Sequence, residues 1–203
     1  MIATRSLLGA RAGQFIVTVA LVAAIAGCGS KTPAQLAIEE LNAGLAASSA
    51  GQTDQAATHY RACVKHDSLN QFCIYNLGVI AQQAGRAAEA ENNYRLALLI
   101  DPNFESAWSN LGILRSQAEA NEEAITIFRR VIEINANNAF AHLNLGLLLR
   151  AEGQLDEAEL ELALALQLDP TVEIPTFEPS PSPTPTEEPP SPSSSESPGQ
   201  TPS

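Results

Sequence analysis

Three cysteines carry the side-chain chemistry of this chain that is easiest to constrain, and they occur in two settings. Cys28 stands between two glycines at the end of an apolar run, whereas Cys63 and Cys73 lie ten residues apart in a mixed polar and apolar stretch. A thiol can be acylated, can form a disulfide or can ligate a metal, and its surroundings decide among these.

The other ionisable residues do not form a catalytic or metal-binding pattern. Three histidines are scattered along the chain, without the cysteine or carboxylate spacing of a zinc site. Glu157, Glu159 and Glu161 alternate, but residues two apart on a helix do not face each other, so they indicate a solvated charged face. The sequence contains no glycine-rich phosphate loop. We predict no enzymatic activity, no cofactor and no metal site.

The segment before Cys28 has the order of a secretory signal. Residues 1–13 contain Arg5 and Arg11 and no acidic residue, and an apolar run then extends from residue 15 to residue 27. These thirteen residues are fewer than the roughly 20 that a helix needs to cross a bilayer. A signal peptide over residues 1–27 is therefore favoured over an uncleaved membrane anchor.

The residues around Cys28, "AIAGCGS", resemble a bacterial lipobox. The resemblance implies that the Cys28 thiol is diacylglycerylated and that the signal is removed just before it. The mature protein would then be lipid-anchored at the extracytoplasmic face of the bacterial cell membrane, with residues 28–36 as the lipidated N-terminus and tether. Two or more acyl chains hold a protein stably, whereas one holds it only reversibly. A plain secreted protein is the remaining alternative.

The charge composition of the mature chain excludes some classes of binding partner. Loss of Arg5 and Arg11 leaves nine basic residues against 23 acidic ones, a formal charge of -14. Nucleic-acid binding depends on clustered lysine and arginine, so we predict no nucleic-acid partner. An acidic protein also gains nothing from electrostatic attraction to anionic lipid, which leaves the acyl anchor as the source of membrane binding.

Cys63 and Cys73 remain as an even pair in an oxidising compartment once Cys28 is assigned to lipid. They form either a disulfide or two small buried apolar residues, a common role of free cysteine.

A 34-residue repeat organises most of the mature chain. Leu-Gly pairs at 77–78, 111–112 and 145–146 are each followed, twelve residues after the glycine, by an alanine and then by a larger residue four positions later. The same register continues one step upstream through Gly44, Ala56 and Tyr60. The predicted units are residues 37–70, 71–104, 105–138 and 139–172.

Each unit is predicted to form two amphipathic helices, because apolar residues recur at three- and four-residue spacings. The turn between them is expected at Gly51, Gly85, Asn121 or Gly153. The glycine of each Leu-Gly pair, on the first helix, would let the alanine-lined second helix approach closely. The large residue on the second helix would fill the gap to the next unit. An Asp-Pro pair would end the second helix, since proline cannot continue it. The fold class is an all-α solenoid of four helix-turn-helix units.

The pattern resembles the tetratricopeptide repeat, most clearly at Trp108, Leu111, Gly112, Ala124, Phe128 and Val131. The resemblance implies a superhelix whose first helices line a concave face that binds a protein or peptide partner. Family members that bind a carboxylate there use lysines and arginines, which this chain lacks at those positions. The ligand is therefore expected to be apolar or neutral.

The predicted peptide-binding groove combines asparagines with apolar and aromatic residues. An asparagine amide can both donate to and accept from a peptide backbone. The alternatives are a solvated or helix-packing role for the asparagines and ordinary packing for the aromatic rings. The predicted groove residues are Phe72, Tyr75, Asn76, Val79, Ser109, Asn110, Ile113, Phe140, Leu143, Asn144 and Leu147.

A second surface is predicted on the last helix, where Leu160 and Leu164 lie four residues apart on an outward face. Terminal repeats normally end in a polar cap, and no further amphipathic helix follows. This surface either binds a partner or a second copy, or the tail folds over it, or two exposed leucines are simply tolerated.

The C-terminal segment, residues 173–203, holds ten of the thirteen prolines together with serine, threonine and glutamate. Such a composition cannot build a core, so we predict a disordered tail. It is a solubilising tail, a spacer, a ligand for wall components or a glycosylated stalk.

Three functions follow, in order of preference. The first is a membrane-anchored scaffold that binds a protein segment in its groove and helps to assemble an envelope complex. The second is a structural or self-associating surface protein that uses the last helix and the tail. The third is an accessory subunit that recruits a wall-modifying enzyme.

Overall fold

The computed structural model describes residues 30–175, which form eight helices and no strands. The predicted all-α fold is confirmed for this range. The predicted signal peptide, Cys28 and residues 176–203 lie outside the described residues. No helix within residues 30–175 is long and apolar enough to cross a membrane. The helices are α1 (Pro33–Ser49), α2 (Thr53–His66), α3 (Gln71–Gln83), α4 (Ala87–Ile100), α5 (Glu105–Gln117), α6 (Asn121–Ile134), α7 (Ala139–Ala151) and α8 (Leu155–Leu168).

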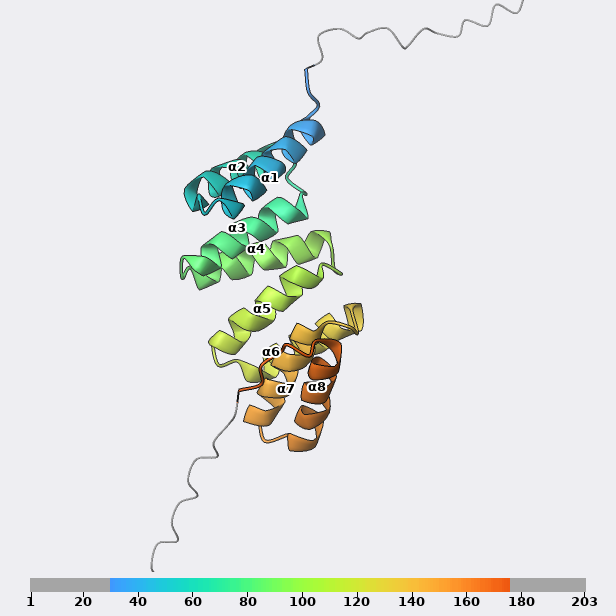
Figure 1. Cartoon of the computed structure of the whole chain (residues 1–203). Coiled ribbons are helices and arrows are strands. Elements are labelled where there is room, and N and C mark those ends of the chain that lie inside the picture. Colours follow the sequence, from blue (N-terminus) through green and yellow to red (C-terminus); the bar gives the residue numbers. More distant parts are fainter. Residues whose placement is uncertain (1–29, 176–203) are drawn as a thin grey trace, which may run out of the picture.

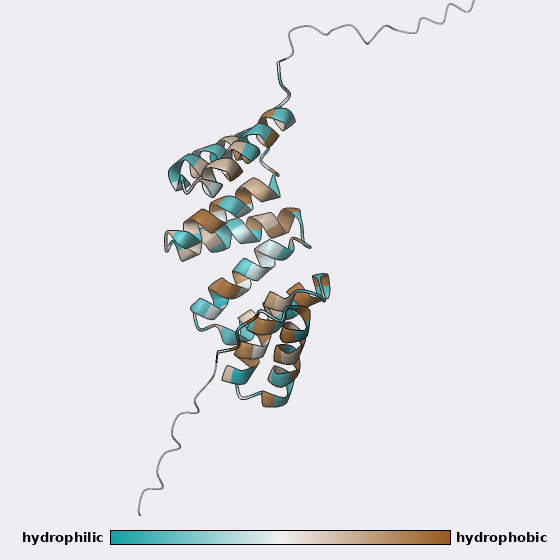
Figure 2. Cartoon of the chain, in the orientation of Figure 1, coloured by the Kyte–Doolittle hydropathy of each residue, from teal (hydrophilic) through white to brown (hydrophobic). Residues whose placement is uncertain are grey.

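Consecutive helices form four hairpin-like pairs that stack in sequence order, from α1 and α2 at one end to α7 and α8 at the other (Figure 1). Each pair contacts the next through its second helix and the following first helix. Buried apolar clusters span neighbouring helices, α1 to α3, α3 to α5 and α6 to α8. Figure 2 shows that each helix carries both apolar and polar residues. The result is the solenoid predicted from the repeat, because each pair can bury its apolar face only against a neighbour.

Within every pair, a glycine on the first helix lies against a large side chain on the second. A Cβ atom added at these glycines would lie 2.5 to 2.9 Å from that side chain, closer than packing allows. The sequence predicted that the large residue fills the gap to the next unit; the structure shows that it first fills the space above its own unit's glycine. The pairs are Gly44 with Tyr60, Gly78 with Tyr94, Gly112 with Phe128, and Gly146 with Leu162.

The turn inside each unit depends on one residue with a positive φ. Gly51, Gly85 and Gly153 have φ values of 72°, 72° and 76°, a region that glycine enters without strain. In the third unit the same position is held by Glu119, at φ 58°. The expectation that Asn121 makes this turn was wrong, because Asn121 is already the first residue of α6.

All four second helices end at the same point of the repeat, followed by Asp67, Asp101, Asn135 or Asp169. Each of these side chains accepts a hydrogen bond through Oδ1 from the backbone N–H two residues later, at 2.9 to 3.1 Å. Proline follows only two of them. The aspartate or asparagine turn is therefore the feature that all four helix ends share. Proline follows it in the second and fourth units and is not needed to end the helix in the first and third.

The first helix begins earlier than the predicted unit. Thr32 accepts a hydrogen bond from the N–H of Gln35 at 3.2 Å, and the Gln35 side chain accepts one from the N–H of Thr32 at 2.9 Å. This capping box, with Pro33 at the first helical position, starts α1 four residues before residue 37. The tether predicted over residues 28–36 is shorter by the helical residues 33–36.

The strained turn at Glu119 predicts a stabilising substitution. Glu119→Gly should raise the free energy of unfolding by about 1 kcal/mol, because a side chain in the left-handed region costs roughly that amount. The matched change Gly85→Ala should lower it by about 1 kcal/mol; no atom lies within 4 Å of the added Cβ, so only backbone strain acts. Urea unfolding of the three proteins measures both. A Glu119→Gly protein no more stable than the parent would contradict this account of the turn.

Candidate functional site

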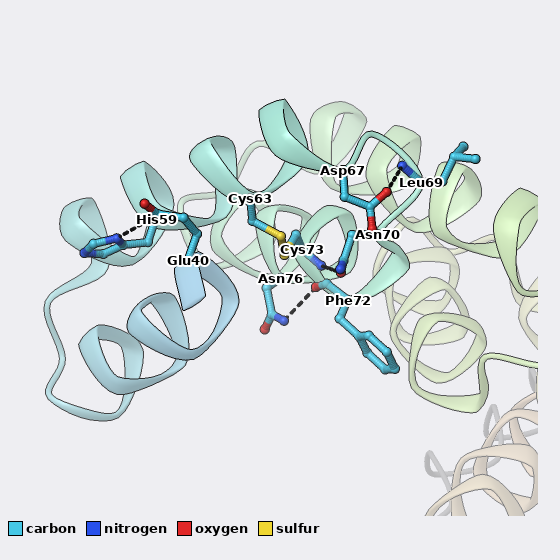
Figure 3. Close-up of a disulfide and its surroundings, with 9 residues drawn as sticks. All are labelled: Glu40, His59, Cys63, Asp67, Leu69, Asn70, Phe72, Cys73 and Asn76. Carbon is cyan, nitrogen blue, oxygen red and sulfur yellow. Dashed lines mark hydrogen bonds and ion pairs between the residues drawn. A yellow bond between two sulfur atoms is a disulfide. The ribbon is translucent and has the colours of Figure 1, made fainter. Parts of the chain in front are cut away.

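A disulfide between Cys63 and Cys73 joins α2 to α3 and so links the first pair of helices to the second. The two Cα atoms are 6.3 Å apart, and both cysteines are fully buried. At the same point Asn70 caps α3 by accepting a hydrogen bond from the N–H of Cys73 at 3.1 Å. Figure 3 shows the Phe72 side chain extending away from the disulfide. The disulfide and the Asn70 cap thus fix the first turn of α3, while Phe72 in the same turn points away from the disulfide.

The residues predicted to line the groove lie on the first helices, on what we call the first-helix face. It comprises Phe72, Tyr75, Asn76 and Val79 of α3, Ser109, Asn110 and Ile113 of α5, and Phe140, Leu143, Asn144 and Leu147 of α7. All are half-buried or exposed.

Contacts across Phe104 bring the α3 and α5 parts of this face together. The Phe104 ring, just before α5, meets Phe72 edge-on at a centroid distance of 5.4 Å and Tyr75 at 4.9 Å. Asn110 of α5 donates from Nδ2 to the Tyr75 hydroxyl at 3.0 Å. Phe72 nevertheless keeps 47% of its surface exposed. Packing therefore orients this ring without covering it.

The α7 part is positioned by contacts with α6 and α8. The ring of Phe140 packs edge-on against Phe128 at a centroid distance of 6.3 Å and remains 43% exposed. Behind it, the buried His142 ring faces the carboxylate of Glu161 at 2.5 Å through Nδ1 and the carbonyl of Ala136 at 3.1 Å through Nε2. These contacts fix the first two turns of α7 and leave Phe140 at the surface.

The three asparagines use their amide groups in different ways. Asn76 and Asn144 each donate from Nδ2 to the carbonyl four residues earlier on their own helix, Phe72 and Phe140, at 2.7 Å. Asn110 instead reaches Tyr75 on the preceding first helix. Each amide has a second N–H and an oxygen beyond these bonds. One N–H of Asn76 and one of Asn144 thus serve their own helix, as the alternative role predicted for these residues requires. Ligand binding by the three asparagines stays a prediction.

The first-helix face is nearly free of charge. Helix α3 contains no charged residue. On α5, Glu105 accepts hydrogen bonds from Asn135 at 3.1 Å and from Asn138 at 2.6 Å, and so is held by the third unit itself. Burial raises the pKa of the Tyr75 hydroxyl, which therefore stays neutral at physiological pH. The face offers aromatic rings, hydroxyl groups and amides to a ligand.

A second feature, an apolar cleft of about 640 Å³, lies between α4 and α6 with α5 at its base. We call it the α4–α6 cleft. Leucine, isoleucine and tryptophan side chains form its centre, while Arg95, Arg115 and Glu123 lie at its edge. Arg115 pairs with Glu91 and Glu123, and Arg95 also pairs with Glu91, so the charges at the edge are balanced. The apolar lining residues are Leu98, Leu99, Trp108, Leu111 and Ile127.

The sequence analysis missed this cleft, although a comparison of units contained a signal. Leu99 is 79% exposed and aligns with Lys65, Glu133 and Gln167 in the other three units. Ile127 likewise aligns with polar residues in all three. An outward position that is polar in three units and apolar in one indicates a local surface feature, which a search for what the repeats share overlooks.

The second predicted surface lies on α8. Leu160 and Leu164 are 67% and 40% exposed, and the described residues after α8 do not cover them. Among residues 30–175, no group of three or more histidine, cysteine, aspartate or glutamate residues could hold a metal ion.

Comparison with known proteins recognises tetratricopeptide repeats in this chain. Family models of the tetratricopeptide repeat match residues 73–104, 105–138 and 127–160. No curated protein matches the chain. The repeat resemblance is thus confirmed for these residues, whereas the lipobox resemblance stays a prediction.

Solved structures share the architecture. MamA from Desulfovibrio magneticus RS-1 is 20% identical, covers 66% of this chain and 76% of its own, and has a TM-score of 0.60. YrrB, a repeat protein described as having an unusual peptide-binding site, is 26% identical over 66% of this chain and 69% of its own, with a TM-score of 0.59. The first repeat domain of Spaghetti (RPAP3), bound to the HSP90 peptide SRMEEVD, is 25% identical over 62% of this chain and 99% of its own, with a TM-score of 0.57.

The disulfide predicts a measurable response to reductant. A bridge between residues ten apart restricts the unfolded chain, so reduction should lower the free energy of unfolding by about 3 kcal/mol. Urea unfolding with and without reductant measures the difference. A variant with both Cys63→Ala and Cys73→Ala serves as control and should not respond to reductant. Equal stability of the parent under both conditions would show that the bridge does not hold the two pairs together.

Proposed function

We propose that the tetratricopeptide repeats of this protein form an interaction scaffold that binds an extended segment of a partner protein on the first-helix face. The observation that carries the proposal is the combination of two exposed aromatic rings, Phe72 and Phe140, with a nearly uncharged surface between them. Aromatic side chains supply large apolar contact areas at interfaces, and amides nearby can satisfy a peptide backbone. The preferred segment is apolar or neutral.

Two structural relatives support a peptide ligand and help to define its chemistry. YrrB and the repeat domain of Spaghetti are both described with peptide binding. The peptide bound to Spaghetti, SRMEEVD, is acidic at its end. In this protein α3 has no cation and α7 has one arginine, Arg150. Recognition of a terminal carboxylate would gain little here, so a different ligand class is expected.

The proposed location follows from Cys28. Lipid on this residue would anchor the protein at the extracytoplasmic face of the cell membrane, and α1 begins only five residues later, at Pro33. So short a connection would keep the repeats close to the bilayer. A scaffold in that position is suited to assembling or positioning a complex of the cell envelope.

A structural role is the second candidate, and one observation favours it. Leu160 and Leu164 form an exposed apolar strip on the terminal helix, where repeat proteins normally carry a polar cap. Association of two copies through α8 would cover this strip without any peptide ligand.

The anchor predicts a change of cellular fraction. Cys28→Ser removes the acylated thiol, so the protein should move from the membrane fraction to a soluble fraction or remain as an unprocessed precursor. Cell fractionation with immunoblotting measures the distribution. Cys63→Ser is the matched control and should leave the protein in the membrane fraction. A Cys28→Ser protein of mature size that stays membrane-bound would contradict lipid anchoring.

The binding face predicts a position-dependent crosslink in cells. A photoreactive amino acid at Tyr75 should capture one discrete partner protein, identified by mass spectrometry of the adduct. The same residue at Leu164 is the matched control. Capture of a second copy at Leu164, with nothing captured at Tyr75, would contradict the scaffold and favour the structural role.

A further inference from the structure

The chain after the last helix turns back along α7. Helices α7 and α8 are antiparallel, since only residues 152–154 separate them and the two helices pack against each other. The chain therefore leaves α8 near the start of α7. Six residues after Asp169, the carbonyl of Pro175 accepts a hydrogen bond from Arg150, in the last turn of α7, at 2.9 Å. After a turn at residues 169–172, the chain runs without regular secondary structure along α7 toward its end (Figure 1).

This returning segment is ordered by its own hydrogen bonds and by partial burial, in addition to its bond with Arg150. Asp169 begins it by accepting hydrogen bonds from the N–H and the hydroxyl of Thr171, at 2.9 and 2.7 Å. Val172 and Ile174 are half-buried, although no further helix follows α8 within residues 30–175. The segment is thus packed against the solenoid up to the last described residue.

Charge directs the segment away from α8. No lysine or arginine follows Arg150 in the sequence. Helix α8 carries Asp156, Glu157, Glu159 and Glu161, and residues 173–203 carry five further glutamates. Like charges repel, so an acidic tail is disfavoured over α8, and Leu160 and Leu164 remain exposed.

The remaining tail has the chemistry and the length to continue over the first-helix face. Residues 176–203 contain nine prolines, and proline-rich segments in the polyproline II form dock on surfaces lined with aromatic residues. Phe140, Phe72 and Tyr75 provide such a surface. At about 3.1 Å per residue, these 28 residues extend up to about 87 Å. Four successive helix contacts of about 10 Å each connect α7 to α3, so the two helices are at most about 40 Å apart.

We propose that the protein's own C-terminal tail, residues 176–203, occupies the first-helix face as an intramolecular ligand. The tail enters at Arg150 and passes over Phe140 toward α5 and α3. This inference rests on the proposed function, because it assigns to the same face a competitor that the partner must displace. The partner segment is therefore expected to be proline-rich and extended as well.

The test uses the full chain with a photoreactive amino acid in place of Thr186, eleven residues beyond Pro175. The expected result is an intramolecular crosslink to first-helix residues of α5 or α3, with a yield that does not change on dilution. Arg150→Gln should lower the ratio of bound to unbound tail about tenfold, because it removes a charge-assisted hydrogen bond. Leu164→Ser is the matched control and should leave the crosslink unchanged.

Three outcomes would overturn the inference: crosslinks on α8 around Leu160, crosslinks to a second copy that weaken on dilution, or no crosslink within the protein. Failure of the proposed function is distinguished by the probe at Tyr75. If the probe at position 75 captures a partner in cells while the probe at position 186 crosslinks to no first-helix residue, only the tail inference fails. If Tyr75 captures the tail and never another protein, the tail inference holds and the scaffold function fails.

Discussion

The close approach of a glycine to a large side chain sets the geometry of every helix pair. At Gly44, Gly78, Gly112 and Gly146 the second helix places a ring or a leucine where a Cβ atom would otherwise lie. A larger residue at any of these positions would push the helices apart, because interiors pack too tightly to absorb an extra carbon. This contact fixes the angle of each first helix, and the first helices together form the face proposed to bind a partner.

Most of the fold could be predicted from sequence because these packing contacts recur every 34 residues. The glycines, the alanines facing them and the large residues left a periodic pattern that identified all four pairs. The errors occurred where one unit departs from the others. The prediction of a turn at Asn121 was wrong because the third unit lacks the turn glycine, and the residue in register with Gly85 is Glu119. The Asp-Pro pair was predicted to end the second helix of the second and fourth units, and the structure adds that an aspartate or asparagine side chain forms the turn in all four.

The candidate site was less predictable, for a physical reason. Repeat register identifies which residues face outward, but not what those residues contact. Thus the position of Tyr75 followed from the pattern, whereas its contacts with Phe104 and Asn110 required the structure. The α4–α6 cleft depends on Leu99 and Ile127, which are exceptions to the pattern. The return of the chain to Arg150 also leaves no periodic signal, because it occurs once.

The glycine contact repeated in the four helix pairs thus supports one nearly uncharged, aromatic face on a protein proposed to be anchored by lipid. Amide hydrogen exchange tests most directly whether this face is the binding site, when a protein ending at Pro175, which lacks the proposed competing tail, is compared alone and in complex with the partner captured through Tyr75. The account predicts slower exchange in α3, α5 and α7 of the complex, with α8 unchanged. Slower exchange confined to α4 and α6, around the apolar cleft, or to α8 would place the binding site elsewhere and contradict it.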